Sequence, residues 1–151
     1  NIAMAEEKNT QERLVWAVAV CRERGLRRTK AMKELLRVLI EAKGPLTLSD
    51  LCGVHSLSEQ CDKATVFRLL GRLQEKGVIR RLGLHERAAY YAFAYPGEHF
   101  DYLVCTDCGK IEALELDCPV EVLEKEVMEQ TGFSGLYHEL EFFGSCPQCV
   151  G

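Results

Sequence analysis

The sequence predicts an α+β protein of two modules, residues 4–95 and residues 98–151. Apolar residues recur at helical spacing as far as about residue 76, after which they alternate with period two. The pair Pro96-Gly97 then interrupts both patterns, as a linker does. The charge changes sign at the same point. Residues 1–96 carry 17 basic residues (Lys and Arg) and 11 acidic residues (Asp and Glu), which gives a net charge of +6. Residues 97–151 carry 2 basic and 12 acidic residues, which gives a net charge of −10.

The first module is predicted to begin with four helices. The three longer ones carry apolar residues three or four positions apart. Thr29 and Thr47 are good N-caps, and Gly25 and Gly77 are good stops. The predicted helices cover residues 6–24, 29–43, 48–52 and 62–76. Strands over residues 78–82 and 89–93 follow, with a turn around residues 83–86. The last three helices and this hairpin match the winged-helix arrangement.

The second module is predicted to be an α/β unit. Residues 102–105 and 111–116 have the pattern of strands. Pro119 is well placed to open a helix that runs to about residue 130 and ends at Gly132. A last strand, residues 136–143, leads into the end of the chain.

Two Cys-x-x-Cys pairs predict one structural zinc site in this module. The pairs are Cys105 with Cys108 and Cys146 with Cys149, and four thiolates in a tetrahedron are a common closed zinc site. Gly109 permits the tight turn that follows the first pair. The alternatives are a disulfide, two unrelated pairs, or a redox pair, although the βαβ context of a thioredoxin-like motif is missing. The four single cysteines, Cys21, Cys52, Cys61 and Cys118, are interpreted as buried free thiols.

The fourth helix has the composition of a DNA-reading helix. A helix in the major groove needs small or polar groups near its N-terminus and flanking cations for phosphates. A solvated basic face is the alternative interpretation. The candidate DNA-binding residues are Lys63, Thr65, Phe67, Arg68 and Arg72, with Arg27 and Lys30 at the start of the second helix.

Composition and motifs also exclude several classes of protein. No apolar run approaches the ~18 residues of a membrane span, and no secretory signal is visible. We therefore expect a cytoplasmic protein with no membrane partner, in which reduced cysteines bind metal. No arrangement of Ser, His and Asp, no phosphate loop and no zinc-protease motif stands out, so we do not expect an enzyme.

Several motifs together resemble the ferric uptake regulator family. They occur in the family's order over about residues 10–149. They are Lys63-Ala64-Thr65-Val66-Phe67-Arg68-Leu69-Leu70, Gly77-Val78-Ile79, Cys105-x-x-Cys108-Gly109-Lys110 with Glu112, His138, and Gly144-x-Cys146-x-x-Cys149.

The resemblance implies a homodimeric, metal-dependent transcription factor, usually a repressor of metal homeostasis genes in bacteria. Its winged helix would bind an AT-rich palindrome in double-stranded DNA. Its second module would dimerise and hold the structural Zn(II). The family usually has Tyr where this chain has Phe67, so one hydroxyl contact is lost.

The resemblance also implies a regulatory metal site in the second module, with ligands His99, Asp101, Glu121 and His138. Two imidazoles and two carboxylates suit Fe(II), Zn(II) or Mn(II). The family's other site, at the hinge between the modules, normally uses a His-x-His that here reads Phe100 and Tyr102. We therefore expect the hinge site to be absent or rebuilt, with two metal ions per subunit.

Other interpretations stay open at this point. Glu121 is also explained as an acid at a helix N-terminus. His138 is also explained as a hydrogen-bonded strand histidine, and His55 and His85 as exposed loop histidines. The Cys118-Pro119 pair allows haem ligation, a thiolate ligand for the sensing metal, or plain packing. The wider alternatives are a zinc-, manganese-, redox- or haem-responsive member of the family, and a zinc-stabilised protein-interaction module without DNA binding.

Overall fold

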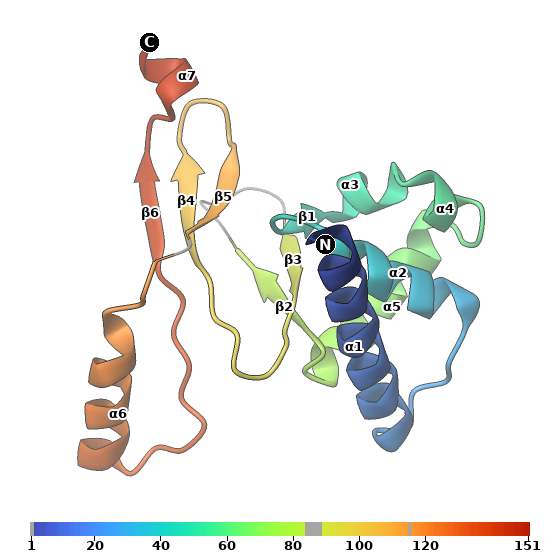
Figure 1. Ribbon diagram of the computed structural model, residues 1–151, viewed down its shortest axis with the longest axis horizontal. Coiled ribbons are helices and arrows are strands. Elements are labelled where there is room, and N and C mark those ends of the chain that lie inside the picture. The colour runs from blue at the N-terminus through green and yellow to red at the C-terminus, as the bar shows by residue number, and fades with distance from the viewer. Residues whose placement is uncertain (1, 84–88, 115) are drawn as a thin grey trace. The chain divides into compact units, whose positions relative to one another are not determined.

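The computed structural model describes residues 2–83, 89–114 and 116–151 (Figure 1). The chain divides into two compact units. The first unit ends at Glu98 and the second is His99–Gly151. Within the described residues, no helix is both long enough and apolar enough to cross a membrane.

Five helices of the described chain lie in the first unit. Side-chain caps explain where three of them begin: Thr29 Oγ1 accepts from Met32 N at 3.1 Å, Thr47 forms a capping box with Asp50, and Asp62 accepts from Thr65 N. The four-residue helix α4 was not predicted, and it makes His55 a helical residue, paired with Glu59 at 2.9 Å. The helices are α1 (Ile2–Glu23), α2 (Lys30–Glu41), α3 (Leu48–Cys52), α4 (His55–Ser58) and α5 (Lys63–Glu75).

A three-stranded antiparallel sheet completes the first unit. Its strands are β1 (Leu46–Thr47), β2 (Ile79–Leu82) and β3 (Tyr90–Phe93), in the order β1-β3-β2. β2 and β3 are the predicted hairpin, whereas the two-residue β1 is too short to show a pattern in sequence. The predicted turn falls mostly on residues 84–88, including His85, which lie outside the described residues. Helices followed by the antiparallel pair β2 and β3 are the elements that the predicted winged helix requires.

One apolar core holds the first unit together. The stripes of α1, α2 and α5 meet over the short helices and the sheet, and burial of apolar surface is the main stabilising term. The opposite face of α5 is thereby left at the surface. The buried residues are Leu14, Ala17, Cys21, Met32, Leu35, Leu36, Leu39, Leu51, Leu57, Val66, Leu70, Leu73, Val78, Ile79 and Tyr91.

Residues 95–98 pack on α1 and so belong to the first unit. Trp16 contacts the ring of Tyr95 edge-on, with centroids 5.3 Å apart. The guanidinium of Arg13 lies over the same ring and pairs with Glu98. These contacts place the structural division between Glu98 and His99, a few residues beyond the predicted linker.

The second unit is a three-stranded sheet with one long and one short helix. Its elements are β4 (Asp101–Cys105), β5 (Ile111–Leu114), α6 (Val120–Thr131), β6 (Glu141–Gly144) and α7 (Pro147–Val150). The order is β5-β4-β6, with β4 antiparallel to β5 and parallel to β6. Residues 136–140 were predicted as strand but are not, and α7 was not predicted. In Figure 1, α6 and α7 lie at opposite ends of this sheet.

Candidate metal centres

The end of β4 builds the first half of a four-cysteine cluster. Gly109, with φ 78°, lets the chain turn back so that its N–H donates to Cys105 O at 2.9 Å. The N–H of Cys108 points at Cys105 Sγ, 3.5 Å away. The tight turn therefore places Cys105 and Cys108 on one side of a small loop.

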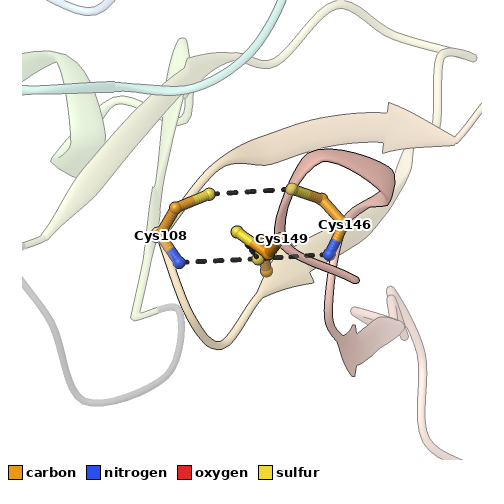
Figure 2. Close-up of side chains that lie close together, drawn as sticks. Cys108, Cys146 and Cys149 are labelled. Carbon is orange, nitrogen blue, oxygen red and sulfur yellow. Dashed lines mark hydrogen bonds between the residues drawn. The ribbon is translucent and has the colours of Figure 1, made fainter. Parts of the chain in front are cut away.

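The end of β6 brings the second half to the same place. β6 runs parallel to β4 with Gly144 opposite Cys105, so the chain leaves both strands at the same end. Cys146 then caps the short helix α7, which carries Cys149, and the N–H of Cys146 donates to Cys105 Sγ at 3.2 Å. Figure 2 shows Cys108, Cys146 and Cys149 turned toward one another.

The spacing of the four sulfurs fits one zinc ion. Cys105 Sγ lies 3.8 Å from Cys149 Sγ, and Cys108 Sγ lies 3.8 Å from Cys146 Sγ. Thiolates bonded to zinc at about 2.3 Å in a tetrahedron are about 3.8 Å apart. Each contact joins one cysteine of each pair, so an ion at this point would bind the two segments together. All four are free thiols here, which does not match the disulfide alternative.

Local hydrogen bonds give the thiols of Cys105 and Cys149 different pKa values. Backbone N–H groups, first that of Cys108 and then that of Cys146, lower the pKa of Cys105 to about 6 because they stabilise its thiolate. Hydrogen bonds with Cys146, Cys105 and Cys108 raise the pKa of Cys149 to about 12. Cys105 is therefore the thiol that would lose its proton most readily, and metal binding would displace the thiol protons of the cluster.

A second group of potential ligands lies at the other end of β4. Asp101 is the first residue of the strand, and His99 precedes it. Cys118 lies just before α6, and His138 lies in the segment that leads into β6. One ligand atom from each of these four residues lies within 4.8 Å of every other. Among the described residues, this group and the four-cysteine cluster are the two that gather three or more such side chains.

Close contacts within the group pair its members. His99 Nε2 lies 2.8 Å from Asp101 Oδ1, and the Asp101 side chain is only 4% exposed. His138 Nε2 lies 3.0 Å from Cys118 Sγ. The two imidazole rings are tilted against each other with centroids 4.5 Å apart. A buried carboxylate beside two imidazoles is a costly arrangement unless a cation or a proton shares it.

The predicted ligand Glu121 is not part of this group. It lies in the first turn of α6 with its side chain exposed. Cys118 takes part instead, and Glu124, one turn further along α6, reaches His138 Nδ1 at 2.6 Å. The sequence did single out Cys118, because it precedes a proline that can open a helix. The helix α6 carries four glutamates, and nothing in the sequence distinguishes Glu124 from the others. Burial of Cys118 raises the pKa of its thiol.

Five of the seven predicted DNA-binding residues lie on α5. Lys63, Phe67, Arg68 and Arg72 are exposed, and Thr65 is half-buried. Phe67 is 59% exposed, which is unusual for a phenylalanine that serves only packing. Arg27 and Lys30 are also exposed, on the loop before α2 and in its first turn.

Comparison with known proteins agrees with the motifs. The ferric uptake regulator family matches residues 23–143. A ferric uptake regulation protein of Synechococcus elongatus is 31% identical over 131 residues, which cover 84% of this chain and 88% of that protein. Matches to other curated relatives span as little as 58% of their length.

Solved structures share the fold. The Helicobacter pylori ferric uptake regulator has a TM-score of 0.72 with 22% identity, over 94% of each chain. A zinc uptake regulator in complex with zinc and DNA has a TM-score of 0.59 with 26% identity, over 93% of this chain and 95% of that one. The match to the family model over most of the chain, together with the Synechococcus relative, settles the assignment: this chain belongs to the ferric uptake regulator family.

Proposed function

We propose that this chain is a metal-dependent repressor that binds an AT-rich palindromic operator as a homodimer. The observation that carries the proposal is the pair of ligand clusters at the two ends of β4, in a unit joined to a winged helix with an exposed basic face. One cluster has the chemistry of a structural zinc site. The other has the mixed donors of a site that can gain and lose its metal.

The four-cysteine cluster would stabilise the second unit. Among the residues of this unit that the structure describes, only four are buried, namely Asp101, Tyr102, Val104 and Cys105. A core this small supplies little hydrophobic stabilisation, and small domains commonly depend on a metal for that reason. Zinc held by four thiolates has no open coordination position, which supports a structural role and gives no basis for catalysis.

The exposed face of α5 would read DNA. Lys63, Arg68 and Arg72 offer cations for phosphates and base edges, and the ring of Phe67 suits a thymine methyl group. Residues 1–96 carry a net charge of +6, whereas the acidic remainder would be repelled by phosphate. The solved structure of a related zinc uptake regulator contains DNA, which supports the same use of the fold here. A DNA target implies a cytoplasmic location.

Exposed apolar side chains on the second unit support a homodimer. Several large hydrophobic side chains of this unit are exposed, and exposed apolar surface commonly marks an interface. A two-fold dimer would also place two winged helices over the two halves of a palindrome. The exposed residues include Leu103, Val122, Leu123, Val127, Phe142 and Phe143.

Metal at the second cluster would regulate DNA binding by linkage. His99 and Asp101 at β4, the start of α6 and His138 before β6 would be tied together by one ion. The metal would raise DNA affinity only by the ratio of its affinities for the binding-competent and incompetent arrangements. We propose two metal ions per subunit, one in each cluster.

Fluorescence anisotropy at fixed salt tests this function directly. The protein, with its four-cysteine site filled by zinc, is titrated into a labelled AT-rich palindrome with and without a second divalent metal. We expect specific binding to strengthen about 5–150-fold with the second metal, the usual range of allosteric coupling. A scrambled duplex is the control. Equal affinity with and without the metal, or no preference for any palindrome, would leave the protein-interaction module as the better account.

A further inference from the structure

The sulfur of Cys118 is positioned to be a ligand. It lies 3.0 Å from His138 Nε2, and the backbone N–H groups of Val120 and Glu121, at the start of α6, point at it. Pro119 begins the turn into α6 and holds the chain direction at this point. The thiol therefore faces the group of ligands rather than solvent.

The hydrogen bond from His138 to Glu124 defines which imidazole nitrogen can bind a metal. A carboxylate only accepts hydrogen bonds, so the 2.6 Å contact with Glu124 Oε2 places the proton of a neutral imidazole on Nδ1. The lone pair of Nε2 then points at Cys118 Sγ and the centre of the group. Metal-binding histidines are commonly oriented by a carboxylate in this way.

The four donor atoms are nearly at zinc-binding distances. One ligand atom from each of His99, Asp101, Cys118 and His138 lies within 4.8 Å of every other. A neutral His99 donates from Nε2 to Asp101 Oδ1, so this proton would move to Nδ1 when Nε2 binds a metal. Tetrahedral zinc, with bonds of about 2.0–2.3 Å, separates N, O and S ligands by about 3.3–3.6 Å. The contacts of 2.8 and 3.0 Å would open by roughly half an ångström, which side-chain rotation can provide.

We propose that Cys118, and not Glu121, is the fourth ligand of the regulatory site, and that its thiolate makes the site selective for Zn(II) over Fe(II) and Mn(II). This inference rests on the proposed function, because it assigns the metal that regulates DNA binding. A soft thiolate with two imidazoles suits zinc, whereas manganese favours sites built from carboxylates and water. Binding of zinc would release the thiol proton of Cys118, whereas the proton of His138 would stay on Nδ1, hydrogen-bonded to Glu124 Oε2.

Cobalt(II) spectroscopy tests the ligand directly. Protein whose four-cysteine site is already filled with zinc is titrated with Co(II). We expect one equivalent to bind with visible tetrahedral bands and a near-ultraviolet sulfur-to-cobalt charge-transfer band. The variant Cys118→Ser should lose the charge-transfer band and bind Co(II) at least about tenfold more weakly, whereas Glu121→Gln should leave both unchanged. Loss of binding in Glu121→Gln with a normal Cys118→Ser would overturn the proposal.

Two further measurements keep the result unambiguous. Glu124→Gln should retain the charge-transfer band but weaken binding by about 10–100-fold, the usual effect of a lost orienting partner. Equimolar Zn(II) should displace the bound Co(II), whereas Mn(II) in large excess should not; displacement by Mn(II) would contradict the selectivity. The spectra are recorded without DNA, so the two proposals can fail separately. Metal-dependent operator binding without a charge-transfer band would reject this inference alone. A normal spectrum without operator binding would reject the proposed function alone.

Discussion

Asp101 and Cys105 occupy the two ends of the same strand, β4, and each belongs to a different ligand cluster. Cys105 lies four positions after Asp101, a distance of roughly 13 Å in extended chain, and their side chains share one face of the sheet. The strand is therefore a rigid spacer between the two clusters. If zinc orders one end of this strand, it would also help to fix the position of the Asp101 carboxylate at the other end, and stability of the fold would then be linked to metal binding at the second cluster.

Replacing Cys105 by Ser should remove the structural zinc and unfold the second unit. Structural zinc supplies roughly 10–16 kcal/mol of apparent binding free energy in small zinc-dependent peptides. We expect zinc at this cluster to fall from one ion per subunit to none, with disorder of residues 99–151 or aggregation. Elemental analysis and thermal unfolding measure both effects. Cys52→Ser, away from both clusters, is the control, and an unchanged melting temperature and zinc content in Cys105→Ser would contradict the prediction.

Replacing Arg68 by Ala should weaken operator binding. If Arg68 contacts a base edge, the cost is about 1–3 kcal/mol with relaxed specificity at one position; if it contacts a phosphate, the loss is uniform across sequences and the salt slope falls by about 1. Anisotropy titrations over a range of salt concentrations separate the two cases. Arg22→Ala, an exposed change of equal charge on α1, should bind normally. Similar losses in both variants would point to a solvated basic face.

A mild chelator should switch off DNA binding without unfolding the protein. The second cluster uses mixed donors, whereas the four thiolates enclose their ion, so the second metal should leave first. Native mass spectrometry should show two metal ions per subunit before chelation and one after it, with unchanged circular dichroism and reduced operator affinity. Three tightly bound ions per subunit would instead indicate a rebuilt hinge site.

Replacing Phe142 by Asp should shift the protein from dimer to monomer. Phe142 lies opposite Leu103 in the β4–β6 pairing, and both side chains are exposed in the isolated chain. A buried, unpaired charge at such a contact is strongly unfavourable. Sedimentation equilibrium measures the association constant. Phe133→Asp, on the loop after α6, serves as the matched control, and a stable Phe142→Asp dimer would place the interface elsewhere.

Lowering the pH should weaken the N-cap of α5. The backbone N–H of Thr65 holds the pKa of the Asp62 carboxyl below its ordinary value. The ionised cap therefore stabilises the folded state fully at any pH above that ordinary pKa. This contribution is lost as the pH falls through the lowered pKa. The difference in melting temperature between the wild type and Asp62→Ala should therefore shrink in acid. Asp62→Asn keeps a cap without a titrating group, and a difference that persists in acid would argue against the carboxylate cap.

Local patterns in the sequence were sufficient for most of the first unit and for the four cysteines. Apolar periodicity marks α1, α2 and α5, and the caps at Thr29 and Thr47 are read from single residues. The Cys-x-x-Cys spacing is also a local pattern, because two cysteines separated by two residues can both bind the same metal ion. The missed elements, β1, α4 and α7, are each four residues or shorter and carry too few positions to show a period.

Only the tertiary structure decided the composition of the second cluster. Its members come from the start of β4, the turn before α6 and the segment before β6, so their meeting depends on how far each loop reaches. Residues 136–140, predicted as strand, form an irregular segment that carries His138 to Cys118 and Glu124 instead of Glu121. Sequence spacing defines which residues share a face of one element, whereas contacts between elements depend on loop paths that no local period encodes.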